Sequence, residues 1–98
     1  MRYNLAIMIK SFKHKGLKNF FLYGDASGIN PNHAKKLKTV LARINADDDI
    51  KDLEYPGYRL HSYKGKTDFW SIDVSGNYRI LFEFRNGDAY ILDYIYPH

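Results

Sequence analysis

Four histidines, His14, His33, His61 and His98, are the side chains of this 98-residue chain best suited to proton transfer near neutral pH. An unperturbed imidazole has a pKa of about 6.5, so its acid and base forms are both accessible there. His14 and His33 stand beside lysines near expected helix starts, and we expect both on the surface rather than as ligands. His61 falls in an expected strand, where a lone histidine is commonly structural, and His98 is the last residue. His61 and His98 are therefore the titratable pair of interest.

The sequence gives little support for a metal site, a cofactor site or an export signal. The chain has no cysteine, its histidines lack the close spacings of metal ligands, and it has no glycine-rich phosphate loop, so we expect no metal and no cofactor. The absence of disulfides favours a reducing cytoplasm. The apolar run at residues 5–9 is too short for an export signal, and no stretch approaches the roughly 20 apolar residues of a membrane span.

Basic residues are concentrated in the first half of the chain. Residues 1–46 carry nine Lys or Arg against one acid, residues 47–54 carry five acids against one Lys, and the remainder is balanced. Such a block favours a polyanionic partner, because each neutralised phosphate releases counterions. The alternative is a lysine-rich solvated surface that keeps the protein soluble. The candidate phosphate anchors are Lys13, Lys15, Lys18, Lys35, Lys36 and Lys38.

Length and composition predict one α+β domain over residues 1–98, with an N-terminal strand and two helices packed on a twisted, mainly antiparallel sheet. The strand is expected at residues 7–12 and the helices at residues 14–23 and 30–46. Gly24 should stop the first helix, and the Asn30-Pro31 pair should start the second. The apolar positions expected to face the core are Leu17, Phe20 and Phe21, followed by Ala34, Leu37, Val40, Leu41 and Ile44.

From residue 58 onward, alternating polar and apolar residues predict strands at residues 58–63, 69–75, 78–85 and 88–96. Asn86-Gly87 predicts a two-residue hairpin loop. For the preceding turn, a three-residue loop at residues 75–77 is favoured over a two-residue loop, because it gathers the apolar residues of both strands on one face.

The Asn86-Gly87 turn fixes the predicted register of the last hairpin. The expected pairs are Phe84 with Ala89, Phe82 with Ile91, Ile80 with Asp93, and Arg79 with Tyr94. One face is then apolar and packs on the helices. The other face holds Ser71, Asp73, Arg79, Glu83, Arg85, Tyr90, Tyr94 and Tyr96. Its simplest interpretation is the solvated side of an antiparallel sheet.

Several segments carry a resemblance that covers nearly the whole chain. They are residues 8–17, the run Pro56-Gly57-Tyr58-Arg59-Leu60-His61-Ser62-Tyr63-Lys64-Gly65, then Trp70-Ser71-Ile72-x-Val74, Asn77-Tyr78-Arg79-Ile80-x-Phe82, Gly87-Asp88-Ala89-Tyr90 and the terminal His98. Together they resemble the HigB family of bacterial toxins, within the RelE/ParE superfamily of type II toxin-antitoxin systems. The resemblance suggests that Met8 is the natural start and that residues 1–7 are an extension.

The resemblance implies a toxin that binds the ribosome and cuts messenger RNA in the decoding site, with a helix-turn-helix antitoxin of the HigA type as its partner. It implies that His61, Lys64, Arg79 and His98 form the active site. The two histidines would then transfer protons without a metal ion, while Arg79 and Lys64 would stabilise charge on the phosphate. The six lysines become candidates for ribosomal RNA contact, and Tyr94 and Tyr96 candidates for RNA binding.

The chain departs from the family at its end. Some HigB proteins end in Asp-Tyr-His, whereas this sequence ends in Tyr96-Pro97-His98, and its nearest acid, Asp93, is expected to point toward the core. One alternative is therefore a catalytically inactive RNA-binding or antitoxin-partner module. Another is a ParE-like gyrase inhibitor, against which the histidine pair argues because gyrase inhibition needs no proton transfer. Arg79 also has a structural alternative, an ion pair with Glu83 or Asp73.

Overall fold

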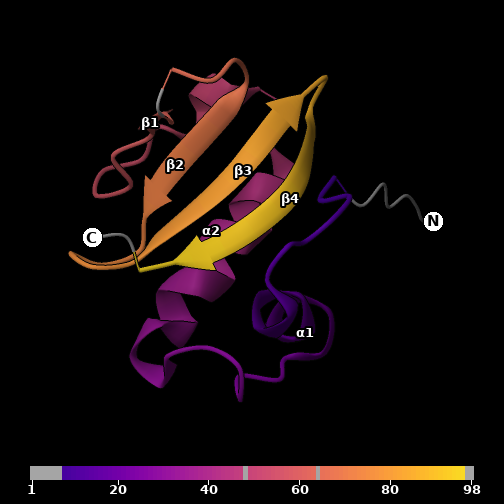
Figure 1. Cartoon of the computed structure of the whole chain (residues 1–98), viewed down its shortest axis with the longest axis vertical. Helices are drawn as coiled ribbons and strands as arrows, with labels where there is room; N and C mark the ends of the chain where they lie inside the picture. The colour runs from indigo at the N-terminus through magenta and orange to yellow at the C-terminus, as the bar shows by residue number, and fades with distance from the viewer. Residues whose placement is uncertain (1–7, 48, 64, 97–98) are drawn as a thin grey trace.

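The computed structural model describes residues 8–47, 49–63 and 65–96. Its elements are α1 (Lys15–Tyr23), the 3₁₀ turn η1 (Pro31–His33), α2 (Ala34–Ala46), the 3₁₀ turn η2 (Ile50–Leu53), β1 (His61–Ser62), β2 (Phe69–Asp73), β3 (Arg79–Arg85) and β4 (Asp88–Ile95). The strands form one antiparallel sheet in the order β1-β2-β3-β4, with the helices packed on one side (Figure 1). The predicted α+β class is confirmed. The expected extension, residues 1–7, lies outside the described residues.

The first helix begins one residue later than predicted because His14 is its N-cap. The Nδ1 atom of His14 accepts a hydrogen bond from the Leu17 N–H at 3.0 Å. His14 is therefore a half-buried capping residue rather than a freely exposed one. The predicted apolar face is confirmed, since Leu17 is fully buried and Phe20 and Phe21 pack against the core. Gly24 ends the helix at a φ of 72°, a left-handed conformation that glycine adopts without strain.

The second helix is preceded by a 3₁₀ turn. The Asn30 side chain accepts a hydrogen bond from the Asn32 N–H at 2.9 Å, and Pro31 occupies the first turn, as the Asn-Pro pair predicts. The regular α-helix starts at Ala34, and Asp47 caps its end. The residues of α2 that are buried are Leu37, Val40, Leu41 and Ile44, which confirms most of the predicted stripe. None of the helices in the described part of the chain has the length and apolar character to cross a bilayer.

Both predicted hairpin turns of the sheet are confirmed. The Val74 N–H donates to the Tyr78 carbonyl at 2.9 Å, which closes a three-residue loop at residues 75–77. In the β3–β4 turn, Asn86 and Gly87 have φ values of 53° and 81°. A type I′ turn requires a positive φ at both central residues, which explains why Asn-Gly occupies it.

The predicted register of the last hairpin is correct only next to its turn. Phe84 faces Ala89 as predicted, and Glu83 faces Tyr90, but the next pair is Leu81 with Asp93. β4 therefore contains one extra residue, a β-bulge. The predicted pairs Ile80 with Asp93 and Arg79 with Tyr94 are wrong, because Ile80 faces Tyr94 and Arg79 faces Ile95, while Phe82, predicted to face Ile91, lies at the irregularity itself. The extra residue reverses the faces of the side chains that follow it, so Asp93 lies on the helix-free face and Tyr94 in the core.

The bulge is stabilised by a residue far away in the sequence. Ile91 has a φ of 50° and is 43% exposed. Its N–H donates to the Ser11 hydroxyl at 2.8 Å, and the Leu92 N–H donates to the Ser11 carbonyl at 3.1 Å. Ser11 therefore satisfies the backbone donors that the bulge leaves without partners in β3.

The segment before α1 lies beside β4 without forming a regular strand. Ile9 and Phe12 each form a single parallel bridge to β4. The side chain of Asn45, in α2, accepts hydrogen bonds from the N–H groups of Met8 at 2.9 Å and Ile9 at 3.2 Å. The strand predicted at residues 7–12 is thus reduced to two bridges, and residue 7 lies outside the described residues.

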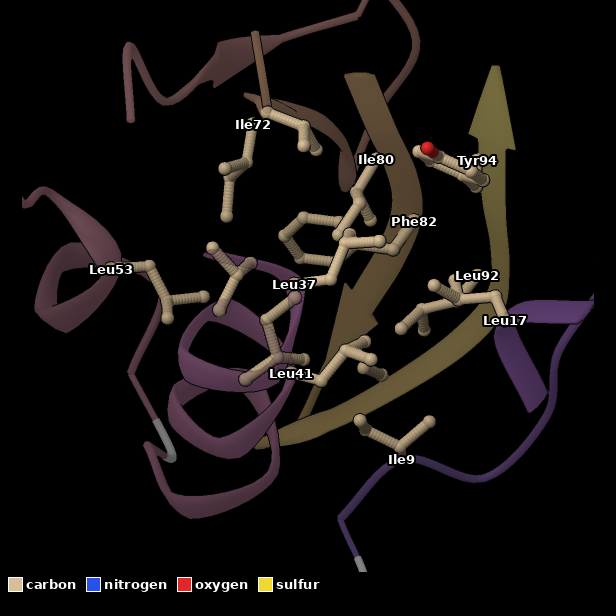
Figure 2. Packing of buried hydrophobic residues seen from close by; sticks show 14 of the residues in the cluster. Ile9, Leu17, Leu37, Leu41, Leu53, Ile72, Ile80, Phe82, Leu92 and Tyr94 are labelled. Carbon is tan, nitrogen blue, oxygen red and sulfur yellow. The ribbon is translucent and has the colours of Figure 1, made fainter. Parts of the chain in front are cut away.

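The core fills the space between the sheet and the helices (Figure 2). Its fully buried side chains include Phe82, Ile72 and Ile80 from the sheet, Leu37 and Leu41 from α2, and Leu17 from α1. We call the opposite side of the sheet the outer face, because the described helices leave it uncovered (Figure 1). The outer face carries Ser71, Asp73, Arg79, Leu81, Glu83 and Asp93, together with His61.

Candidate active site

Cross-strand pairing places two of the predicted catalytic residues, His61 and Arg79, on the outer face. His61 faces Ser71 across β1 and β2, and Arg79 faces Asp73 across β2 and β3. Ser71 and Asp73 are two positions apart in β2, so their side chains point to the same side of the sheet. Facing residues also share a side. His61 and Arg79 therefore belong to adjacent rows of side chains on the outer face, in which Ser71 and Leu81 are buried.

The chain before β1 holds His61 in a defined orientation. The predicted strand at residues 58–63 is reduced to two residues, because Gly57 and Arg59 have φ values of 85° and 47° and turn the chain. This turn brings the Arg59 carbonyl to 2.6 Å from Nδ1 of His61. A carbonyl oxygen only accepts hydrogen bonds, so Nδ1 carries the proton of the neutral ring. Nε2 is then the basic nitrogen, on an exposed side chain that is able to remove a proton from a substrate.

Arg79 and Arg59 share one carboxylate, that of Asp73. Arg79 Nε lies 3.6 Å from Oδ1 of Asp73, and Arg59 Nη1 lies 3.3 Å from Oδ2. The Asp73 side chain is only 13% exposed, whereas that of Arg79 is 34% exposed. Arg79 contacts Asp73 through Nε, and its guanidinium carries further N–H donors on its two terminal amino groups. These groups are the ones that bind two phosphate oxygens at once.

The structure links His61 to Arg79 through this pair of ionic contacts. Arg59 contacts His61 through its carbonyl and Asp73 through its guanidinium, and Asp73 contacts Arg79. The structural alternative raised for Arg79 is partly observed, since it pairs with Asp73. Glu83 instead pairs with Arg85 at 2.9 Å. The two candidate catalytic residues, His61 and Arg79, are therefore connected through Arg59 and Asp73.

The other two predicted catalytic residues, Lys64 and His98, lie outside the described residues. Lys64 belongs to the connection between β1 and β2, and His98 follows β4 in the sequence. The end of β4 is itself well placed for this site, because Ile95 faces Arg79 across the sheet. The strand that leads to His98 therefore ends in the same row as Arg79 and Asp73.

Of the two predicted RNA-binding tyrosines, the structure places Tyr94 in the core. Tyr94 is 7% exposed, and its hydroxyl lies 2.6 Å from Nδ1 of His33 and 3.3 Å from the backbone nitrogen of Asn30. The β-bulge causes this placement, and burial leaves no ring face for a base. Tyr96 is 47% exposed, with its ring centroid 5.1 Å from that of Tyr78. Only Tyr96 is therefore kept as a candidate for base stacking.

His33 is also buried, contrary to the expectation of a surface position. Only 9% of the residue is exposed, and its ring packs edge-on against Tyr78 at a centroid distance of 4.8 Å. Burial and the nearby charge of Lys36 lower the pKa of His33 below its usual 6.5. Burial raises the pKa of Tyr94. The neutral forms of both groups are thus favoured, as their shared hydrogen bond requires.

The six predicted anchor lysines border different features of the structure. Lys13 pairs with Asp93 at 3.8 Å, near the outer face, while Lys15 and Lys18 are exposed on α1. Lys38 borders an apolar cavity between α1 and α2. The remaining two, Lys35 and Lys36, line a separate groove beside α2.

Two residues of the site were missed by sequence reasoning. Arg59 lay inside the matched motif but received no role, because its left-handed backbone and its carbonyl contact to His61 have no sequence signature. Asp73 was considered only as a possible ion-pair partner. Its position between two arginines arises from the pairing of β2 with β3 and from the turn before β1.

Comparison with known sequences identifies the class of protein that has this α+β fold. The family model described as the RelE-like toxin HigB of type II toxin-antitoxin systems matches residues 10–98. The chain therefore belongs to the HigB-like toxin family. It is 47% identical over 88 residues to the Endoribonuclease HigB of Proteus vulgaris, an alignment that covers 89% of this chain and 96% of that relative.

Proposed function

We propose that this toxin is a metal-independent endoribonuclease that cuts messenger RNA on the ribosome and thereby inhibits translation. The family match and the relative named as an endoribonuclease support the activity. The observation that carries the chemistry is the orientation of His61, whose Nδ1 is bonded to the Arg59 carbonyl while Arg79 lies in the adjacent row. The 98 residues are proposed to act as a single toxin domain.

The proposed reaction transfers two protons around one phosphate. Nε2 of His61 removes the 2′-hydroxyl proton, and the 2′-oxygen forms a bond to phosphorus. The bond from phosphorus to the 5′-oxygen breaks, and His98 supplies the proton to the departing oxygen. Arg79 and Lys64 stabilise the negative charge that develops on the phosphate. Each positioned proton transfer typically contributes about 10²- to 10⁴-fold to the rate.

The partners follow from the toxin class. A type II toxin has a protein antitoxin, and we propose that this antitoxin is of the HigA type, with a helix-turn-helix domain. The proposed site of action is the ribosome in the cytoplasm, where ribosomal RNA provides the polyanion that the basic half of the chain favours.

In vitro translation tests this proposal. Messenger RNA should be cut at codons only when ribosomes are present, and cutting should continue when a chelator that binds transition metals but spares the Mg²⁺ of the ribosome is added. The His98→Ala and His61→Ala proteins should each cut at least about 10²-fold more slowly, while Lys51→Gln, which changes an exposed residue of η2, should cut at the normal rate.

Two results would contradict the proposal. One is cutting that persists at the normal rate in both histidine variants. The other is intact messenger RNA together with inhibition of DNA supercoiling by gyrase, which would support the ParE-like alternative. Soluble protein with neither activity would support the catalytically inactive module.

A further inference from the structure

A basic groove with an aromatic floor lies beside α2, apart from the catalytic residues. It has a volume of about 640 Å³ and is lined by Asn32, Lys35, Lys36, Thr39, Arg43, Tyr55, Pro56 and Tyr58. Three of these side chains are cations and none is a carboxylate. We infer that this groove binds a short stretch of single-stranded RNA, with a phosphate on Lys35 and a base stacked on the Arg43–Tyr55 pair.

The stacking platform is already assembled in the structure. The Arg43 guanidinium carbon lies 3.7 Å from the centroid of the Tyr55 ring, and the rings of Tyr55 and Tyr58 are 5.2 Å apart. A guanidinium plane that stacks on an aromatic ring offers its other face to a nucleobase, and unpaired RNA bases commonly stack on such planes. A double-stranded RNA would not present free base faces to this platform.

The cations of the groove differ in the contacts that they already make within the protein. Lys36 donates to the Gly57 carbonyl at 3.3 Å and so helps to hold the loop against α2. Lys35 is exposed, one position earlier on the helix. Asp47, the C-cap of α2, accepts a hydrogen bond from the Tyr55 hydroxyl at 3.3 Å and begins the acidic segment of the chain. Asp47 follows Arg43 by one helical turn and opposes phosphate at that end of the groove, whereas Lys35 lies near the start of α2. Lys35 is therefore the phosphate contact, and Arg43 belongs to the stacking platform.

The groove is joined to the candidate active site by a short piece of chain. Tyr58 is the last groove residue, Arg59 follows it, and the Arg59 carbonyl contacts His61. An RNA strand in the groove therefore lies next to the edge of the sheet at which His61 is held. The inference rests on the proposed function for the identity of the polymer, and it adds a second contact region outside the catalytic residues.

Fluorescence anisotropy of the full-length protein with a labelled RNA of about 12 nucleotides tests the groove. The RNA carries 2′-O-methyl groups, so it has no nucleophile and is not cut. Lys35→Gln should weaken binding and make the slope of log K against log salt shallower by about 0.7, the contribution of one phosphate contact to a single strand. Lys51→Gln, the charge-matched control, should leave the slope unchanged.

The aromatic platform has its own variant and control. Tyr55→Leu should lower the affinity by about tenfold or more. Tyr23→Leu, which changes an exposed tyrosine at the end of α1, should have no effect. Circular dichroism and thermal unfolding should show that all four variants are folded.

The outcomes separate this inference from the proposed function. If His61→Ala abolishes cutting while the groove variants bind RNA as tightly as Lys51→Gln, the groove inference is overturned and the nuclease proposal stands. If the groove variants bind RNA normally but no longer bind the antitoxin, the groove is a protein-binding surface and the inference is again wrong. If His61→Ala still cuts while groove binding behaves as expected, the catalytic proposal fails and the groove remains.

Discussion

A largely buried carboxylate, that of Asp73, stands between two guanidinium groups at the candidate site. It contacts Arg59 and Arg79 through different oxygen atoms. Arg59 in turn holds the imidazole of His61 through its carbonyl. Asp73 is therefore placed to position both the proposed proton-transfer group, His61, and the proposed phosphate-binding cation, Arg79.

We expect Asp73→Asn to slow cutting by about 10- to 100-fold, because a misplacement of reacting groups by about 1 Å costs on the order of 10²-fold. The variant loses the charge that holds both arginines but keeps the shape of the side chain. The loss should appear mainly in kcat in the translation assay. Glu83→Gln is the matched control, because Glu83 pairs with Arg85 on the same face and contacts neither His61 nor Arg79. Equal rates for the two variants would contradict the positioning role.

Asp93 is the acid nearest to the end of this chain, whose last three residues include none. Asp93 was expected to point toward the core, but it lies on the outer face and pairs with Lys13. Its Oδ1 also accepts a hydrogen bond from the N–H of the next residue, Tyr94, at 2.9 Å. An acid is therefore present on the outer face of β4, in the row that continues from His61 through Ser71 and Leu81.

Among the elements, β4 is the one whose geometry differs most from its sequence pattern. Its bulge places Ile91, a β-branched residue, at a φ of 50°. This conformation costs an L-residue roughly 1 to 2 kcal/mol, and asparagine tolerates it better. The two hydrogen bonds to Ser11 offset the strain.

Ile91→Asn should therefore raise the free energy of unfolding, by about 1 kcal/mol. The exposed position of the side chain means that little apolar burial is lost. Ile91→Val keeps the β-branched strain and should not stabilise the protein. Urea denaturation of the wild-type protein and of the two variants measures the difference. A less stable Ile91→Asn protein would show that the strand is regular at this position in solution.

At the scale of the whole molecule, the start of α2 is tied to the end of β4 by buried polar groups. The Tyr94 hydroxyl accepts from the Asn30 N–H, so its own proton is directed at Nδ1 of His33. The neutral imidazole accepts this bond, whereas a protonated one would bring a second donor and a buried charge. Protonation of His33 thus opposes the packing of the two elements.

The stability of the fold should consequently depend on pH near neutrality. The pKa of His33 is lower in the folded protein than the 6.5 of an ordinary histidine. Between these two values the unfolded chain binds more protons, so the free energy of unfolding falls as the pH falls below about 6.5 and is fully retained above it. His33→Gln should flatten this dependence in urea titrations between about pH 5.5 and 7.5. An unchanged slope in the variant would contradict the assignment to His33.

Much of this protein was determined by its sequence alone, because the deciding interactions are local. The helix caps at Asn30 and Gly24, the apolar stripe of α2, and the type I′ turn at Asn86-Gly87 each depend on residues a few positions apart. These signals predicted the α+β class, and the alternation of the strands placed Arg79 on the helix-free side.

The tertiary structure alone decided which other side chains join Arg79. The bulge in β4 depends on Ser11, a residue 80 positions from Ile91, and one inserted residue moved Tyr94 into the core and Asp93 out of it. The contact from Arg59 to His61 depends on a left-handed backbone, and that from Asp73 to two arginines depends on strand pairing. Hydrogen-bond donors and charges must find partners wherever the folded chain supplies them, and such distant partners leave no periodic pattern in the sequence.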